Sequence, residues 1–167
     1  MNHKPYRFFL GANSSQGFVS FFENALEDDA IRQNFIFKGG PGCGKSTAMK
    51  QAAQEGLRRQ QPMEIIHCSS DPSSLDGVLF LEQGKALYDG TAPHTIDLPF
   101  PGAQGGYILP PPFLLEEELV QKADALQQVQ QKLSACYRQV FTLTAAAGQV
   151  EKRLHLLLSG ITDVARL

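Results

Sequence analysis

The sequence predicts an α/β fold in which helices flank a parallel-centred sheet, with a long helix or a helical hairpin appended at the C-terminus. Two observations carry this prediction. Apolar runs of strand length alternate with helical patterns up to residue 89, and a glycine-rich turn separates one strand from the helix after it. Beyond residue 112, apolar side chains recur every seven residues instead. We therefore expect an α/β domain over residues 1–112 and a helical segment over 113–167.

The composition is that of a globular chain. Of its 167 residues, 43% are hydrophobic and 19% are charged, and the formal net charge is −2. This length can bury a real core, and the charge indicates no surface for nucleic acid or an anionic membrane. Three cysteines without metal-ligand spacing fit a reducing compartment. No apolar stretch is long enough for a signal peptide or a membrane span, so we expect a soluble, cytoplasmic protein.

The first elements are expected to be a strand, a helix and a second strand. Strands are predicted over residues 7–10, which contain the apolar run 8–10, and over the apolar run 35–37. Between them, four apolar side chains keep helical spacing after a serine that can cap the first turn. The apolar residues are Phe18, Phe21, Phe22 and Leu26, and the capping serine is Ser14 or Ser15.

The strand at 35–37 leads into the most informative motif of the chain. The sequence fits G-x-x-x-x-G-K-[ST] with a strand before it and a helix to about Arg59 after it. This is the context of a phosphate-binding loop (P-loop), and it makes the expected fold a P-loop NTPase type. The residues expected to bind the nucleotide are Gly39, Gly40, Pro41, Gly42, Cys43, Gly44, Lys45, Ser46 and Thr47.

Each residue type in the motif suits the binding of phosphate. Glycines let successive N–H groups approach phosphate oxygens, and the N-terminus of the following helix adds positive potential. Lys45 is expected to hold the β- and γ-phosphates, Ser46 to hold Mg²⁺, and Thr47 to face the α-phosphate. We expect ATP rather than GTP, because the guanine-reading pattern N-K-x-D is absent from the sequence.

Mg²⁺ also requires a carboxylate at the end of a neighbouring strand. Asp89 ends an apolar run at 86–89, and Asp71 follows the strand expected at 64–68 after a polar turn. We favour Asp89 and keep Asp71 as its rival or partner, although both residues also suit an aspartate that stabilises its own turn. His94 is a further candidate for contact with the γ-phosphate or water. The alternative is that His94 is an ordinary loop histidine exposed to solvent.

Three further stretches complete the expected domain. Gly90 stands where many ATPases place a glutamate that activates water, so the sequence supplies no base at that position. Residues 78–81 fit a strand or a buried apolar turn. The Pro- and Gly-rich stretch at 91–112 is long for a connection, and we expect a mobile loop beside the nucleotide.

The helical segment carries two sets of positions with heptad spacing. A helical hairpin packed on its own domain, an intermolecular coiled coil and a single long helix all fit this pattern. Gly148 does not decide between them, because one glycine costs only about 1 kcal/mol in a helix. The first set is Leu119, Leu126, Leu133, Val140, Ala147, Leu154 and Ile161, and the second is Lys122, Val129, Cys136, Leu143, Val150, Leu157 and Val164.

Four stretches resemble one group of uncharacterised bacterial P-loop ATPases, which are also described as nucleotide-kinase-like. They are FFLGANSSQGFVSFFENAL (8–26), FIFKGGPGCGKST (35–47), HCSSDPSSLDGV (67–78) and YDGTAPHTID (88–97). The resemblance implies ATP binding but carries no settled substrate. Members look like tandem duplications with a phosphate loop in each half, and this chain resembles the N-terminal half.

This resemblance implies an incomplete sheet. About four strands are expected here, whereas P-loop sheets commonly have five or more. An open sheet edge, or the helical segment, would then favour self-association or binding of the missing C-terminal half.

The leading expectation for function is Mg²⁺-dependent binding and hydrolysis of ATP. A small-molecule or nucleotide kinase that uses the same phosphate loop is the first alternative. The second is a nucleotide-gated module that binds a partner with little turnover. The sequence leaves open the phosphoryl acceptor, the aspartate that holds Mg²⁺ and the biological pathway.

Overall fold

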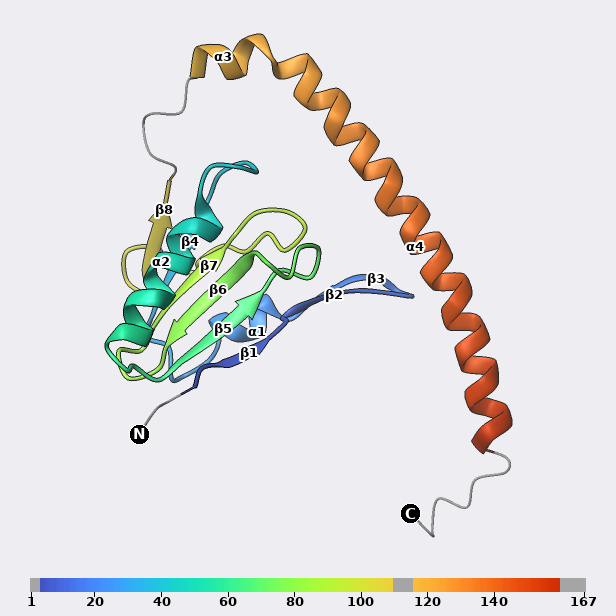
Figure 1. The fold of residues 1–167 in the computed structure, drawn as a ribbon, viewed down its shortest axis with the longest axis horizontal. Coiled ribbons are helices and arrows are strands. Elements are labelled where there is room, and N and C mark those ends of the chain that lie inside the picture. Colours follow the sequence, from blue (N-terminus) through green and yellow to red (C-terminus); the bar gives the residue numbers. More distant parts are fainter. Residues whose placement is uncertain (1–3, 110–115, 160–167) are drawn as a thin grey trace. The chain divides into compact units, whose positions relative to one another are not determined.

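The structure is a computed structural model that describes residues 4–109 and 116–159 (Figure 1). It confirms the α/β prediction and the long C-terminal helix. The chain forms two compact units, one of residues 1–12 and 20–114 and the other of residues 13–19 and 115–167. The boundary predicted between residues 112 and 113 lies outside the described residues.

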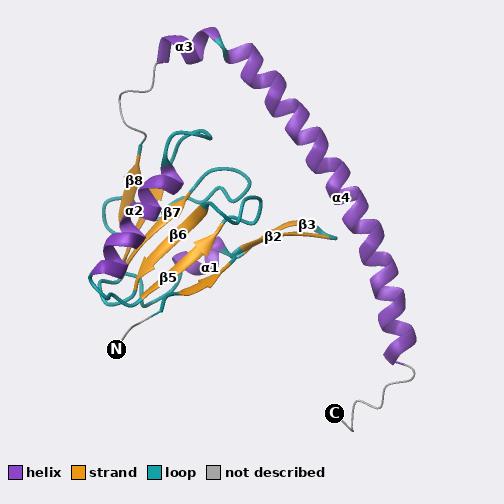
Figure 2. Ribbon diagram, in the orientation of Figure 1, coloured by secondary structure: helices purple, strands orange, loops and turns teal. Residues whose placement is uncertain are grey.

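The first unit is built on a six-stranded mixed sheet with the spatial order β1-β5-β6-β7-β4-β8 (Figure 2). Five strands run in one direction, and β6 runs antiparallel to both of its neighbours. The strands are β1 (Tyr6–Phe8), β4 (Gln33–Phe37), β5 (Met63–His67), β6 (Leu75–Phe80), β7 (Lys85–Asp89) and β8 (Gly105–Ile108).

The prediction of a parallel-centred sheet is therefore wrong at β6. Only a few residues connect β6 to β5 before it and to β7 after it. Such short connections allow antiparallel pairing, whereas a parallel pair requires a crossover of a dozen or more residues. The sheet also has more strands than the four or so expected, since residues 78–80 belong to β6 and β8 lies in the stretch 91–112.

The stretch expected to be a mobile loop is fastened to the sheet. Ile96 and Leu98 are buried in the core. The Lys38 ammonium donates hydrogen bonds to the carbonyl oxygens of Gly90 (3.2 Å) and Ile96 (2.7 Å) and pairs with Asp97 at 2.8 Å. Lys38 directly follows β4, so these bonds hold residues 90–97 against the end of that strand.

Two hydrophobic clusters pack around the sheet, because successive side chains of a strand point to opposite faces. The helix α2 (Lys45–Arg58) packs on β5, β6 and β7 and buries Met49 and Ala53 in the first cluster. The short helix α1 (Phe22–Leu26) contributes Phe22 to the second cluster, together with Ile36, Ile66 and Tyr88.

The prediction of a helix that starts at Ser14 or Ser15 is wrong, because the helix begins only at Phe22. Residues 11–20 instead form a hairpin of β2 (Gly11–Ser14) and β3 (Gly17–Ser20). The Ser14 hydroxyl donates to the carbonyl of Gly17 at 2.8 Å and accepts from the amide of Gln16 at 3.0 Å. Ser14 thus closes a turn rather than capping a helix.

The second unit contains α3 (Glu116–Gln121) and α4 (Ala123–Ser159). The helix α4 passes Gly148 without a break, so over the described residues the segment is one long helix after α3 and not a hairpin. Large side chains of the heptad positions, such as Val129, Leu143 and Val150, are mostly exposed. No helix in the described part of the chain combines the length and apolar character that a membrane crossing requires.

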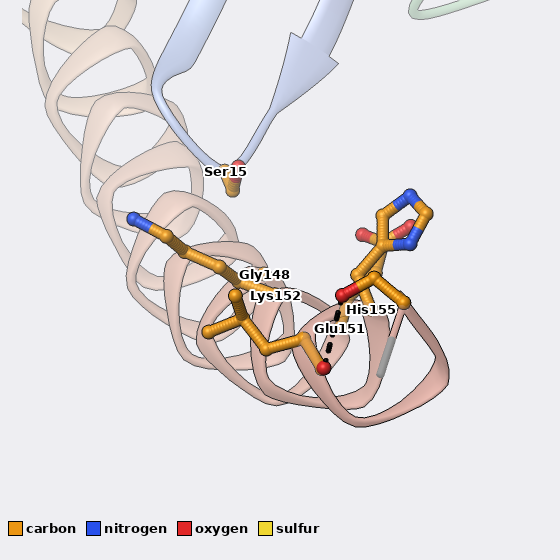
Figure 3. A pocket seen from close by; sticks show the side chains of 7 residues that line it. Ser15, Gly148, Glu151, Lys152 and His155 are labelled. Carbon is orange, nitrogen blue, oxygen red and sulfur yellow. Dashed lines mark hydrogen bonds between the residues drawn. The ribbon is translucent and has the colours of Figure 1, made fainter. Parts of the chain in front are cut away.

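Gly148 is where the turn of the hairpin approaches α4. Figure 3 shows Ser15 beside Gly148, and a Cβ atom at position 148 would lie 2.5 Å from the Cβ of Ser15. One turn earlier in the helix, the Thr144 hydroxyl donates to the carbonyl of Ser14 at 3.2 Å. The missing side chain at position 148 therefore permits this contact.

Gly148→Ala is expected to displace the hairpin turn while leaving α4 intact. The added methyl overlaps Ser15, whereas alanine favours the helix itself by about 1 kcal/mol. Hydrogen exchange should show lost protection over residues 13–19 and unchanged protection over α4. Gln149→Ala, at an exposed neighbouring position, is the matched control, and equal protection in both variants would contradict the prediction.

Candidate functional site

The glycine-rich loop predicted to bind phosphate joins the end of β4 to the start of α2. Gly42 (φ +81°) and Gly44 (φ +86°) both adopt left-handed backbone conformations, which favour glycine. Apart from each glycine and its two chain neighbours, no atom of the described residues lies within 4 Å of a Cβ built at Gly40, Gly42 or Gly44. The loop backbone therefore borders open space at all three positions.

The N-terminus of α2 directly follows this loop. Gly44 is the residue before its first turn, and no side chain caps that turn. The first turn contains no acidic residue and begins with Lys45. Acidic side chains favour this position because they offset the positive end of the helix dipole, and here no side chain of the first turn does so.

The Lys45 side chain is buried, with 9% of it exposed, and folds back over the loop. Its ammonium donates hydrogen bonds to the carbonyl oxygens of Gly39 (2.7 Å) and Gly40 (3.0 Å). It also lies 3.7 Å from Oδ2 of Asp89 and 3.8 Å from Sγ of Cys43. A buried ammonium group requires such partners to offset its lost hydration.

Asp89 comes to Lys45 because β4 and β7 are neighbouring parallel strands, in which Phe37 pairs with Asp89. Its carboxylate is largely buried. Oδ1 accepts from the amide (3.0 Å) and the hydroxyl (2.6 Å) of Thr91, while Oδ2 faces Lys45. The structure thus brings together two of the residues that the sequence selected.

Ser46 lies at the start of α2, where its hydroxyl accepts a hydrogen bond from the amide of Leu75 at 3.0 Å. Thr47 is exposed. The described residues contain no group of three His, Cys, Asp or Glu side chains that could hold a metal ion. Mg²⁺ needs no such group, since one or two protein oxygens commonly hold it together with phosphate oxygens. Ser46 and Asp89 each carry an oxygen of the kind that Mg²⁺ accepts as a ligand.

Asp71 acts as a turn residue between β5 and β6. Its carboxylate accepts hydrogen bonds from the Ser73 amide (3.0 Å), the Ser73 hydroxyl (2.6 Å) and the Ser74 hydroxyl (2.6 Å). The bonds from these two serines lower the pKa of Asp71. Both aspartates therefore stabilise the turn that follows them, and Asp89 differs in that its second carboxylate oxygen faces Lys45.

His94 is neither solvated nor at the surface, since only 5% of its side chain is exposed. Its Nε2 lies 3.0 Å from Oδ2 of Asp76, and its Nδ1 lies 3.0 Å from the carbonyl of Thr91. The ring meets that of Phe22 edge-on, with centroids 4.3 Å apart. Burial lowers the pKa of this imidazole.

Asp76 is the site residue that sequence reasoning missed. Burial raises the pKa of Asp76 to about 6, a hydrogen bond with Cys68 opposes the shift, and the charges of Asp89 and Lys45 also act on it. Asp76 therefore shares the electrostatic surroundings of the pair formed by Lys45 and Asp89. The sequence does contain one sign of this residue, an aspartate within the largely apolar strand LDGVLF. Charged residues are seldom buried without a partner, so such an aspartate indicates a candidate site residue.

Gly90, the residue after Asp89, is a point of close packing. A Cβ atom there would overlap Cγ2 of Ile36 and would lie 3.3 Å from the carbonyl oxygen of Ile96. No larger side chain fits at this position without displacing Ile36. The packing thus gives a physical reason for the missing glutamate beside Asp89.

The fold and the site describe an α/β protein with a lysine-bearing glycine loop between a strand and a helix. Comparisons with known protein families, curated proteins and solved structures found no match.

Proposed function

We propose that the chain is a P-loop NTPase-type protein that binds Mg·ATP at residues 39–47 and hydrolyses it. The observation that carries this proposal is the buried ammonium of Lys45, which lies over the glycine loop and 3.7 Å from Asp89. A lysine that served only to close a turn would more commonly extend its charged end into water, because burial of an ammonium group is costly.

The surroundings of Lys45 support an anionic ligand of the size of a phosphate. The first turn of α2 carries neither an acidic residue nor a side-chain cap, and the glycine backbone borders open space. Lys45 can exchange its bonds to the carbonyl oxygens of Gly39 and Gly40 for bonds to phosphate oxygens, which are charged acceptors and form stronger bonds.

Ser46 and Asp89 are the residues that would hold Mg²⁺. When bound, Mg²⁺ would neutralise part of the negative charge on the phosphate oxygens. The chain itself would orient the triphosphate through its loop amides and stabilise charge on the γ-phosphate through Lys45.

Two alternatives each rest on one observation. Gly90 has no room for a water-activating glutamate, which favours a kinase that transfers the γ-phosphoryl group to a small molecule or nucleotide. The exposed apolar side chains of α4 favour a nucleotide-gated module that binds a partner.

One experiment separates the three hypotheses. It measures phosphate release from Mg·ATP by the purified chain and equilibrium ATP binding on the same samples. Hydrolysis predicts Mg²⁺-dependent release without any further substrate. A kinase would consume ATP substantially only when an acceptor is added, and a binding module would bind ATP without turnover. Absence of ATP binding would overturn all three hypotheses.

Asp89→Ala is expected to lower Mg²⁺-dependent turnover at least about thirtyfold, whereas Asp71→Ala should change it less than about threefold. The first substitution removes the carboxylate beside Lys45. Truncating one partner of a buried charge pair costs about 2 kcal/mol or more, which corresponds to this fall in turnover. The second removes turn hydrogen bonds only. Steady-state phosphate release measures both variants, and a larger loss in Asp71→Ala would reverse the assignment of the metal-side acid.

A further inference from the structure

We propose that Asp76 and His94 are positioning residues for Asp89. In this proposal they fix the turn over residues 89–94, and this turn directs the Asp89 carboxylate toward Lys45. The inference rests on the proposed function, because it assigns the residues that set the geometry of the same site.

A continuous path of contacts connects the two pairs. The Lys45 ammonium faces Oδ2 of Asp89, and Oδ1 of Asp89 accepts two hydrogen bonds from Thr91. The carbonyl of Thr91 meets Nδ1 of His94, and Nε2 of His94 meets Oδ2 of Asp76. Every contact beyond Lys45 in this path is 3.0 Å or shorter.

The chemistry of these partners determines where the protons lie. A carbonyl oxygen only accepts, so the proton of the bond to Thr91 belongs to Nδ1 of His94. The contact between Nε2 and Asp76 then contains one further proton, which belongs either to the ring or to the carboxyl group. In both cases the pair carries no net charge, which suits its buried position.

This arrangement favours a positioning role over an acid–base role. Both ring nitrogens of His94 are already engaged, and the ring packs edge-on against Phe22. The imidazole would have to break one of these bonds before it could accept a proton from a substrate. Asp76 comes from β6, so the pair also ties residues 89–94 to a strand of the sheet.

The test uses three variants that differ in which bonds survive. His94→Phe keeps the aromatic contact with Phe22 and removes both polar bonds. Asp76→Leu removes the carboxyl group at similar size. Asp76→Asn is the matched conservative variant, because its amide can still donate to Nε2 of His94.

The first readout is the Mg²⁺ concentration that gives half-maximal enhancement of ATP binding, measured beside ATP binding in EDTA. His94→Phe and Asp76→Leu should raise this concentration at least about tenfold, because Asp89 is no longer held toward the site. ATP binding in EDTA should change less than about threefold, since the loop and Lys45 remain. Asp76→Asn should shift the Mg²⁺ dependence less than about threefold.

The second readout is made on the wild-type chain without nucleotide, so it does not depend on the folding of any variant. Long-range ¹H–¹⁵N spectra of the wild-type chain should show a protonated Nδ1 for His94 that exchanges slowly with water. A ring with an unprotonated Nδ1 would overturn the inference, because the bond to Thr91 would then be absent.

The binding results separate this inference from the function on which it rests. Wild-type Mg²⁺ dependence in both His94→Phe and Asp76→Leu would overturn the positioning role and leave ATP binding standing. A loss in Asp76→Asn as large as in Asp76→Leu would also overturn it, since the carboxyl group itself would then be required. A wild-type chain that does not bind ATP would overturn the proposed function together with the inference.

Discussion

Lys45→Ala is expected to weaken ATP binding at least about a hundredfold, which corresponds to about 2.7 kcal/mol. The substitution removes the buried ammonium that would pair with the β- and γ-phosphates, and truncated charge pairs of this kind cost about 2–5 kcal/mol. It also leaves the carbonyl oxygens of Gly39 and Gly40 without their present donor. Calorimetric titration with Mg·ATP gives the affinity, and turnover should fall with it.

Lys50→Ala is the matched control for this prediction. Lys50 belongs to the same helix and carries the same charge, but it is exposed to solvent. Its removal tests whether a general loss of positive charge explains the effect, and ATP affinity should change less than about threefold. Equal affinities for Lys45→Ala and the wild type would contradict the proposed site at the glycine loop.

Gly90→Ala is expected to lower the free energy of unfolding by about 3 kcal/mol, the upper end of the usual cost of overpacking. The added methyl overlaps Cγ2 of Ile36, which is fully buried between neighbouring strands. The same methyl would also lie 3.3 Å from the carbonyl oxygen of Ile96, which limits how far it can shift. Urea denaturation of the two proteins measures the difference.

A double-mutant cycle tests the mechanism of this loss. Ile36→Leu removes the branch that carries Cγ2 while keeping the volume of the side chain, so it should cost less than about 1.5 kcal/mol alone. Combined with Gly90→Ala, it should recover at least about 1 kcal/mol through a favourable coupling. Additive losses in the double variant would show that the overlap with Ile36 is not the cause.

The strand, the loop and α2 could be predicted because their signals are local. An apolar run, glycines at fixed spacing and a lysine before a helical pattern all occur within about fifteen residues. The choice of Asp89 followed from one further rule, that neighbouring parallel strands place their carboxyl ends at the same edge of a sheet. The structure shows Asp89 beside Lys45 for that reason.

The elements that could not be predicted depend on long-range contacts. The spacing of Phe18, Phe21 and Phe22 fits a helix, yet hairpin pairing and burial of Phe22 determine the outcome. Asp76 and His94 are eighteen positions apart, and only the folded sheet brings them within 3.0 Å. Asp71 and Asp89 look alike in sequence because each precedes a turn, and their different partners become visible only in three dimensions.

The pairing of β4 with β8 connects the strand before the glycine loop with the strand that leads to the helices. β4 leads into the glycine loop, and β8 is the strand after which the chain continues to α3 and α4; the Lys38 amide donates to the carbonyl of Ile108 at 3.0 Å. If nucleotide at the loop changes the affinity of the helices for a partner by some factor, that partner must change nucleotide affinity by the same factor. Under the proposed function, such a partner of α4 would be detected as a shift in ATP affinity, without any direct assay of the helix.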